Sequence, residues 1–170
     1  GLKRDFLSAV RSLARDASDV RAVLITGNGR SFSAGADRDA TTADFGNIDL
    51  AQSLIDDYHP LMLELANLEI PVVFAVNGIA AGAGMRIAIS ADIVIAARSA
   101  YFLQAFVNIG LVPDSGSTFI LPRLIGNARA TAMMMLGEKV MAETALEWGM
   151  IAEVVDDNDL TARATQIATR

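Results

Sequence analysis

The amino-acid sequence predicts an α/β domain with a mainly parallel sheet flanked by helices. Two runs of apolar residues, 71–76 and 92–96, are the right length for strands buried on both faces. The segment between them, 83–90, is predicted to be a helix, and alternating strands and helices are typical of parallel sheets. A chain of 170 residues, 52% hydrophobic and 20% charged, can bury one substantial core. We therefore expect a single domain over residues 1–170.

The other helices and strands are predicted from hydrophobic periodicity and from residues that end or interrupt regular structure. An amphipathic helix is predicted over 2–17, and a buried strand over 20–26. Residues 38–47 are polar and aperiodic, which predicts a loop, and a helix follows over 50–68. Pro60 is expected to kink or divide this helix. Further along the chain we expect helices over 116–125, 128–136, 142–148 and 160–169, and a strand over 151–155.

Composition excludes several classes of function. The net charge of −6 and the lack of a basic cluster argue against nucleic-acid binding. Without cysteine there is no disulfide, thiolate nucleophile or Cys-based metal site, so we expect no metal and a cytoplasmic location. The longest apolar stretches, such as 70–76 and 87–97, are too short to span a bilayer or are interrupted by charge, so no membrane anchor is expected.

Two turns rich in small residues follow the first two strands, at 33–37 and 77–84. Small residues let the backbone approach a ligand, and the carboxyl ends of neighbouring strands are where an open α/β sheet binds one. Alternatively, the glycines only permit tight turns and close packing. A dinucleotide site is a weaker alternative, because Ile87 stands where the third glycine should follow Gly82 and Gly84.

Three segments, 29–37, 75–84 and 109–116, together resemble the enoyl-CoA hydratase/isomerase (crotonase) superfamily, and segments 121–126 and 145–149 extend the match. The closest resemblance is to the subset that is similar to 1,2-epoxyphenylacetyl-CoA isomerase. This resemblance implies the crotonase (ClpP-like) fold, built of repeated ββα units. It also implies an acyl-CoA thioester as substrate, with CoA as part of that substrate and no separate cofactor.

The resemblance further implies an oxyanion hole made of two backbone N–H groups. By motif position these belong to Ala36 and Ala83. Moving a proton beside a thioester carbonyl places negative charge on its oxygen, which fixed N–H dipoles stabilise. Contacts with the acyl-CoA are expected from Ser33, Ala34, Asp37, Gly82 and Phe106.

The type of reaction depends on which carboxylate side chains are present near the thioester. Hydratases of the family carry two glutamates, at positions that here hold Arg86 and Phe106, and neither residue can act as a general base. Asp114 matches the catalytic carboxylate of the isomerase-like subset. Alternatively, Asp114 only makes a turn and caps the helix that begins near Ser115. We expect an acyl-CoA isomerase, with an enoyl-CoA hydratase or lyase and a non-catalytic acyl-CoA-binding homologue as alternatives.

Several side chains near these motifs carry further expectations. Phe106, Val112 and Phe119 are expected to desolvate Asp114 and so make it a better base. Arg86 can pair with Asp114 or lie on the helix surface, and we favour the surface.

For three other features of the sequence we expect a structural role and not a catalytic one. His59 is read as packing or surface, residues 133–135 as helix core or trimer contact, and Trp148 as packing.

Family members usually carry an amino-terminal strand pair with basic CoA contacts and carboxyl-terminal helices that close the pocket. Residues 1–170 show neither, so we expect either omitted or truncated ends or an altered oligomer. Homotrimers or dimers of trimers are the predicted assembly.

Overall fold

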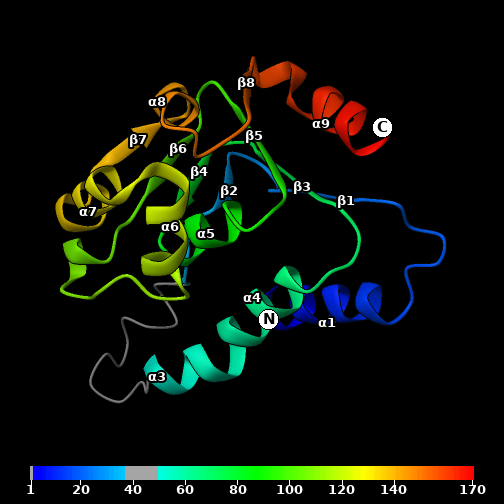
Figure 1. The fold of residues 1–170 in the computed structure, drawn as a ribbon, viewed down its shortest axis with the longest axis horizontal. Coiled ribbons are helices and arrows are strands. Elements are labelled where there is room, and N and C mark those ends of the chain that lie inside the picture. The colour runs from blue at the N-terminus through cyan, green and yellow to red at the C-terminus, as the bar shows by residue number, and fades with distance from the viewer. Residues whose placement is uncertain (1, 37–49) are drawn as a thin grey trace.

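The computed structural model describes residues 2–36 and 50–170, whose strands form two four-stranded sheets at the centre of the fold (Figure 1). The first sheet is parallel throughout, and the second is parallel except at its last pair of strands. The first sheet has the order β1 (Val23–Thr26), β3 (Val72–Val76), β5 (Ile93–Ala97) and β8 (Glu153–Val155). The second has the order β2 (Ser31–Ser33), β4 (Ile79–Ala81), β6 (Tyr101–Leu103) and β7 (Lys139–Met141).

Consecutive strands contribute alternately to the two sheets. β1, β3 and β5 lie in the first sheet, and the strand that follows each of them, β2, β4 or β6, lies in the second. Helix α5 (Ala83–Ala88) follows β4, and α6 (Ser117–Ile125) is the next α-helix after β6. The predicted α/β class with a mainly parallel sheet is confirmed, and the pairs of strands followed by helices agree with the implied ββα units.

The amino-terminal helices form one side of the molecule. Helix α1 (Leu2–Arg15) lies beside α4 (His59–Ala66), and an ion pair of 2.8 Å joins Arg11 Nε to Glu64 Oε1 (Figure 1). Between α3 (Leu50–Ser53) and α4 the chain makes a π-helical turn, so the helix predicted over 50–68 is divided. Pro60 is the second residue of α4, where its missing N–H costs little, and this confirms the expected break. Apolar residues of these helices pack on Phe74 of β3, including Leu7, Val10, Leu61 and Leu65.

Helices also cover the remaining parts of the sheets. Helix α9 (Leu160–Ala168) contacts β1, β3 and β5, while α7 (Asn127–Leu136) packs on α6 and α8 (Ala142–Glu147) on β7. Trp148 packs against the main core, as predicted. Met133 is buried there, whereas Met135 is 69% exposed, so the methionine run is only partly core.

The sequence prediction missed β2, β4, β6 and β7 as separate strands. Each contains only three residues, too few to show an alternating pattern, and β4 lies inside the segment read as a glycine-rich turn. The loop predicted over 38–47 lies outside the described residues. Within the described parts of the chain, no helix is long and apolar enough to cross a membrane.

Candidate functional site

The two small-residue bends lie against each other at neighbouring strand ends. One bend follows β2 and the other follows β4, and these strands are paired in parallel. A methyl group built on Gly35 would lie 2.9 Å from the Ala81 carbonyl oxygen and 3.7 Å from the Ala83 nitrogen. A methyl group on Gly84 would overlap Ser33. Both contacts require glycine, so the close approach of the two bends depends on these positions.

Hydrogen bonds also connect the turns beneath the bends. Asn77, at the end of β3, accepts a bond of 3.0 Å from Gly27 N–H through its side-chain oxygen. Its amide nitrogen donates to the Gly29 carbonyl at 2.9 Å. One side chain therefore holds the turn after β1 to the turn after β3.

The N–H groups of Ala36 and Ala83 are free at this junction. Within the described residues, neither group donates a hydrogen bond. Ala83 is the first residue of α5, where a helix leaves its N–H groups without a partner in the helix. Gly82, with φ of 54°, turns the chain into α5. The structure thus brings the Gly35-Ala36 bend beside the Gly82-Ala83 bend.

The other predicted contact residues are distributed around this junction. Ser33 lies against Gly84, and Phe106 is 7% exposed and comes within 3.9 Å of a methyl group built on Gly82. Ala34 is exposed, and Asp37 lies outside the described residues. Among the residues that the structure does describe, no group of three or more acidic or histidine side chains is arranged to hold a metal ion.

Asp114 lies on the segment between β6 and α6 and is half buried. The hydroxyl of Ser115 donates a hydrogen bond of 2.9 Å to its Oδ1 atom. Burial raises the pKa of the Asp114 carboxyl above the ordinary value of 3.8, while this hydrogen bond and the charge of His59 act in the opposite direction. Gly116 precedes the first residue of α6, and no side chain caps this helix end. Of the alternative in which Asp114 makes a turn and caps the helix, the cap is therefore wrong, whereas the turn is present, because the Ser117 N–H donates to the Asp114 carbonyl at 2.8 Å.

A tyrosine that the sequence prediction overlooked lies near Asp114. Tyr58, at the end of the π-helical turn, is buried, and burial raises the pKa of its hydroxyl; the negative charge of Asp114 adds to the rise. His59 is exposed, in agreement with its reading as a surface or packing residue, but its charge reaches Asp114. Both residues are some 55 positions from Asp114 in the sequence, so only the tertiary fold reveals this proximity.

Two of the three apolar side chains expected around Asp114 do not enclose it. Val112 is 80% exposed and Phe119 is 60% exposed, so the expectation that they desolvate the carboxyl is wrong. The ring of Phe119 instead stacks on the guanidinium of Arg123, 3.5 Å from its centre, on the outer face of α6.

Arg86 also departs from its predicted position. Its Nε and Nη1 atoms are buried, so the surface position that we favoured is wrong. The alternative pairing with Asp114 is absent too, because no ion pair or hydrogen bond joins the two side chains. Burial alone lowers the pKa of this guanidinium.

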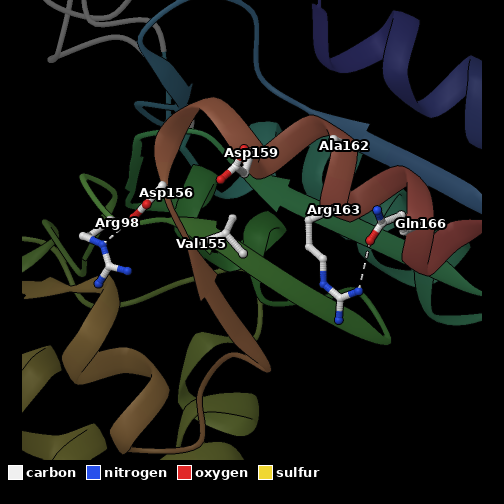
Figure 2. Close-up of a pocket in the computed structure, with 7 residues that line it drawn as sticks. All are labelled: Arg98, Val155, Asp156, Asp159, Ala162, Arg163 and Gln166. Carbon is white, nitrogen blue, oxygen red and sulfur yellow. Dashed lines mark hydrogen bonds and ion pairs between the residues drawn. The ribbon is translucent and has the colours of Figure 1, made fainter.

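A hollow of about 380 Å³ lies between β8 and α9, and the predicted site residues are not part of it (Figure 2). Both of its arginines are paired with carboxylates: Arg98 with Asp156 at 2.9 Å, and Arg163 with Glu153 at 2.8 Å. None of the predicted site residues lines it. The lining residues are Arg98, Val155, Asp156, Asp159, Ala162, Arg163 and Gln166.

Known proteins are similar to this chain in sequence and in fold. The enoyl-CoA hydratase/isomerase family model matches residues 2–170. A 1,2-epoxyphenylacetyl-CoA isomerase of Escherichia coli K12 is 48% identical over 161 residues, covering 94% of this chain and 61% of that protein. A trans-2-decenoyl-acyl-carrier-protein isomerase of Streptococcus mutans is 36% identical, covering 98% of this chain and 64% of that protein.

The solved structures extend the similarity to the fold. An enoyl-CoA hydratase from Bacillus anthracis superposes with a TM-score of 0.92 at 30% identity, covering 99% of this chain and 64% of that one. The chain therefore has the crotonase fold that its motifs implied. It spans about three fifths of the length of the curated relatives it matches.

Proposed function

Because the chain belongs to the enoyl-CoA hydratase/isomerase family, we propose that it isomerises an acyl-CoA thioester through an enolate. The observation that carries the proposal is the junction of the two bends, where the free N–H groups of Ala36 and Ala83 lie at neighbouring strand ends. Two such donors form an oxyanion hole for the thioester oxygen. The substrate would bring its own CoA, and the proposal includes no separate cofactor.

The oxyanion hole acts on the charge that develops during the reaction. When a proton leaves the carbon beside the thioester carbonyl, the electron pair moves onto the carbonyl oxygen. Fixed backbone dipoles stabilise this charge without reorganising, and one donor is typically worth about 3–4 kcal/mol of transition-state stabilisation. Because the donors belong to the backbone, the side chains of Ala36 and Ala83 mainly set the available space.

Asp114 is the proposed proton carrier. Its carboxylate takes a proton from one carbon of the acyl chain, which gives the dienolate and a carboxylic acid. The acid then returns the proton to another carbon of the chain, so the double bond moves and Asp114 regains its charge. The raised pKa of Asp114 suits this role, because a base whose pKa is nearer the working pH both accepts and returns protons efficiently.

Isomerisation is preferred over hydration because of the residues at the two hydratase glutamate positions. Arg86 stays protonated, and Phe106 has no proton to exchange, so neither can activate water. The relatives carry both kinds of name, since the Escherichia coli protein is an isomerase and the Bacillus anthracis structure a hydratase. A hydratase or lyase, and an acyl-CoA-binding homologue without activity, therefore remain the alternatives.

A trimer or dimer of trimers is the proposed assembly. Apolar side chains at the end of α7 and on β7 are exposed, including Met135, Leu136 and Met141, and they offer a surface for a second copy. Cytoplasmic location stays a prediction from composition.

A panel of CoA thioesters tests the reaction, with the full-length protein and products followed by NMR. We expect migration of the double bond in 3-enoyl-CoA substrates, or rearrangement of an epoxy-acyl-CoA, without uptake of solvent oxygen. Addition of water to 2-enoyl-CoA would favour the hydratase, and binding without turnover would favour the inactive homologue. Asp114→Asn should bind acyl-CoA normally and lose turnover by about 10²-fold or more. Near-normal activity of this variant would refute the role of Asp114.

A further inference from the structure

Arg86 carries a partly buried guanidinium that has no partner among the described residues. Its Nε and Nη1 atoms are shielded from solvent and form no hydrogen bond with any described residue. Other arginines of this chain are paired with carboxylates, among them Arg11, Arg98 and Arg163. A buried guanidinium with unused N–H groups is costly, because both its charge and its donors have lost their water.

No carboxylate in the described part of the chain reduces this cost. Burial is the only cause that shifts the pKa of Arg86, and Arg86 is not among the groups that shift the pKa of Asp114. An arginine side chain stays protonated even when its pKa falls, so the positive charge persists in the site. The described residues therefore leave this charge available to an anionic ligand.

The position of the guanidinium relates this charge to the acyl group. Arg86 lies on α5, three residues after Ala83, and its backbone N–H donates to the Gly82 carbonyl at 3.1 Å. The side chain extends toward Gly116, two residues after Asp114. It therefore extends from the helix that begins at Ala83 toward the turn that follows Asp114, the two segments that carry the proposed catalytic groups.

One edge of the guanidinium lies beside Gly116, a residue without a side chain. A methyl group built on Gly116 would lie 3.7 Å from Nε and 3.9 Å from Nη2 of Arg86. These two nitrogens form one of the edges with which arginine binds a carboxylate through two parallel hydrogen bonds. Gly116, with φ of 83°, places no side chain of its own over that edge.

We propose that Arg86 determines substrate specificity by binding a carboxylate carried by the acyl group, so that the preferred ligand is the monothioester of a dicarboxylic acid. This inference rests on the proposed function, because it assumes that the acyl chain enters between Ala83 and Asp114. The phosphates of CoA are a poorer match, since the pantetheine arm separates them from the thioester.

Matched saturated ligands test the inference by binding alone. Succinyl-, glutaryl- and adipoyl-CoA each carry a terminal carboxylate, and butyryl-, valeryl- and hexanoyl-CoA are their uncharged counterparts of equal chain length. Calorimetry on the full-length protein should show at least one dicarboxylic member bound about 10-fold or more tightly than its counterpart. The chain length of that member would report the distance from the thioester to Arg86.

Variants test whether Arg86 causes the preference for a terminal carboxylate. Arg86→Met should remove it while leaving the affinity for the uncharged thioesters within about threefold. Arg86→Lys, which keeps the charge without the planar pair of donors, should retain part of it. Arg123→Met is the matched control, because that arginine lies on the outer face of α6 against Phe119, and it should keep the full preference.

Equal affinities within all three pairs, or a preference that survives in Arg86→Met, would overturn the inference. If the wild-type protein bound none of the six thioesters, the proposed function would fail together with it. A carboxylate preference in a protein that isomerises no enoyl-CoA would refute the proposed reaction but leave Arg86 as the carboxylate-binding residue.

Discussion

Ser115 donates its hydroxyl hydrogen to Oδ1 of Asp114 at 2.9 Å, and it does so from a left-handed backbone conformation with φ of 51°. Left-handed geometry is unfavourable for a non-glycine residue, so the surrounding structure must maintain it. The contact opposes the effect of burial, which raises the pKa of the same carboxyl.

Removal of this hydroxyl should shift the pH dependence of turnover. Asp114 must be ionised to accept a proton, so activity rises with pH through the pKa of its carboxyl. Ser115→Ala removes a contact that lowers this pKa, and the acidic limb of the profile should therefore move to higher pH. Profiles of kcat/KM against pH check the shift. Ser115→Gly also lacks the hydroxyl but relieves the backbone, and it should move the limb equally; an unchanged limb in both would contradict the assignment.

Asp114→Asn should make the protein more stable at neutral pH. The pKa of Asp114 is raised on folding, so its contribution to stability is complete below the ordinary value of 3.8 and is lost as pH rises through the folded-state pKa. Asparagine keeps the shape and an acceptor for Ser115 but carries no charge. Thermal unfolding should give a higher Tm for the variant at pH 7 and similar values near pH 3. A lower Tm at pH 7 would show that the ionised carboxyl is stabilised by contacts.

Gly35→Ala should impair the proposed oxyanion hole. The new methyl group would lie 2.9 Å from the Ala81 carbonyl, so the two bends must separate, and misplacement of about 1 Å can cost about 10²-fold in rate. Gly29→Ala is the matched control, because Gly29 also has a positive φ but has no atom near its missing side chain. Both variants should lose some stability, and only Gly35→Ala should lose kcat/KM. Equal kinetic losses would attribute the effect to backbone strain.

Asn77→Ala should destabilise the fold by about 1–3 kcal/mol, because it leaves the Gly27 N–H and the Gly29 carbonyl without their partner. Asn28→Ala, at an exposed position in the adjoining turn, should change the free energy of unfolding by less than about 0.5 kcal/mol. Denaturant unfolding at constant m-value measures both. A neutral Asn77→Ala would mean that the two turns are held by packing alone.

The parts of the fold that the sequence predicts well are those with long, uniform patterns. β3 and β5 each run for five residues with almost no exposed position, and their apolar composition alone indicates burial on both faces. The three-residue strands leave no comparable signal, because three residues are too few to show a hydrophobic pattern. The family motifs indicated which two bends come together, as the positions of Gly35 beside Ala81 and of Gly84 beside Ser33 illustrate.

The side chains around the candidate site were harder to predict. Two guanidinium nitrogens of Arg86 are buried although its residue type favours the surface, and Val112 and Phe119 are exposed although they are apolar. Each outcome depends on which element packs opposite, and Tyr58 reaches Asp114 only because the helices before β3 fold back onto the sheets. Such contacts are properties of the tertiary structure.

The alternation of strands between the two sheets has a consequence for how this architecture can diversify. Because β2 and β4 are paired, the bends that carry Ala36 and Ala83 start from strands held at the spacing of a β-ladder, about 4.8 Å, whatever side chains surround them. Nearby acidic, basic and apolar side chains can change through mutation while these two backbone segments keep their positions. A single scaffold can thereby acquire new reactions by replacing one proton-transferring side chain at a time.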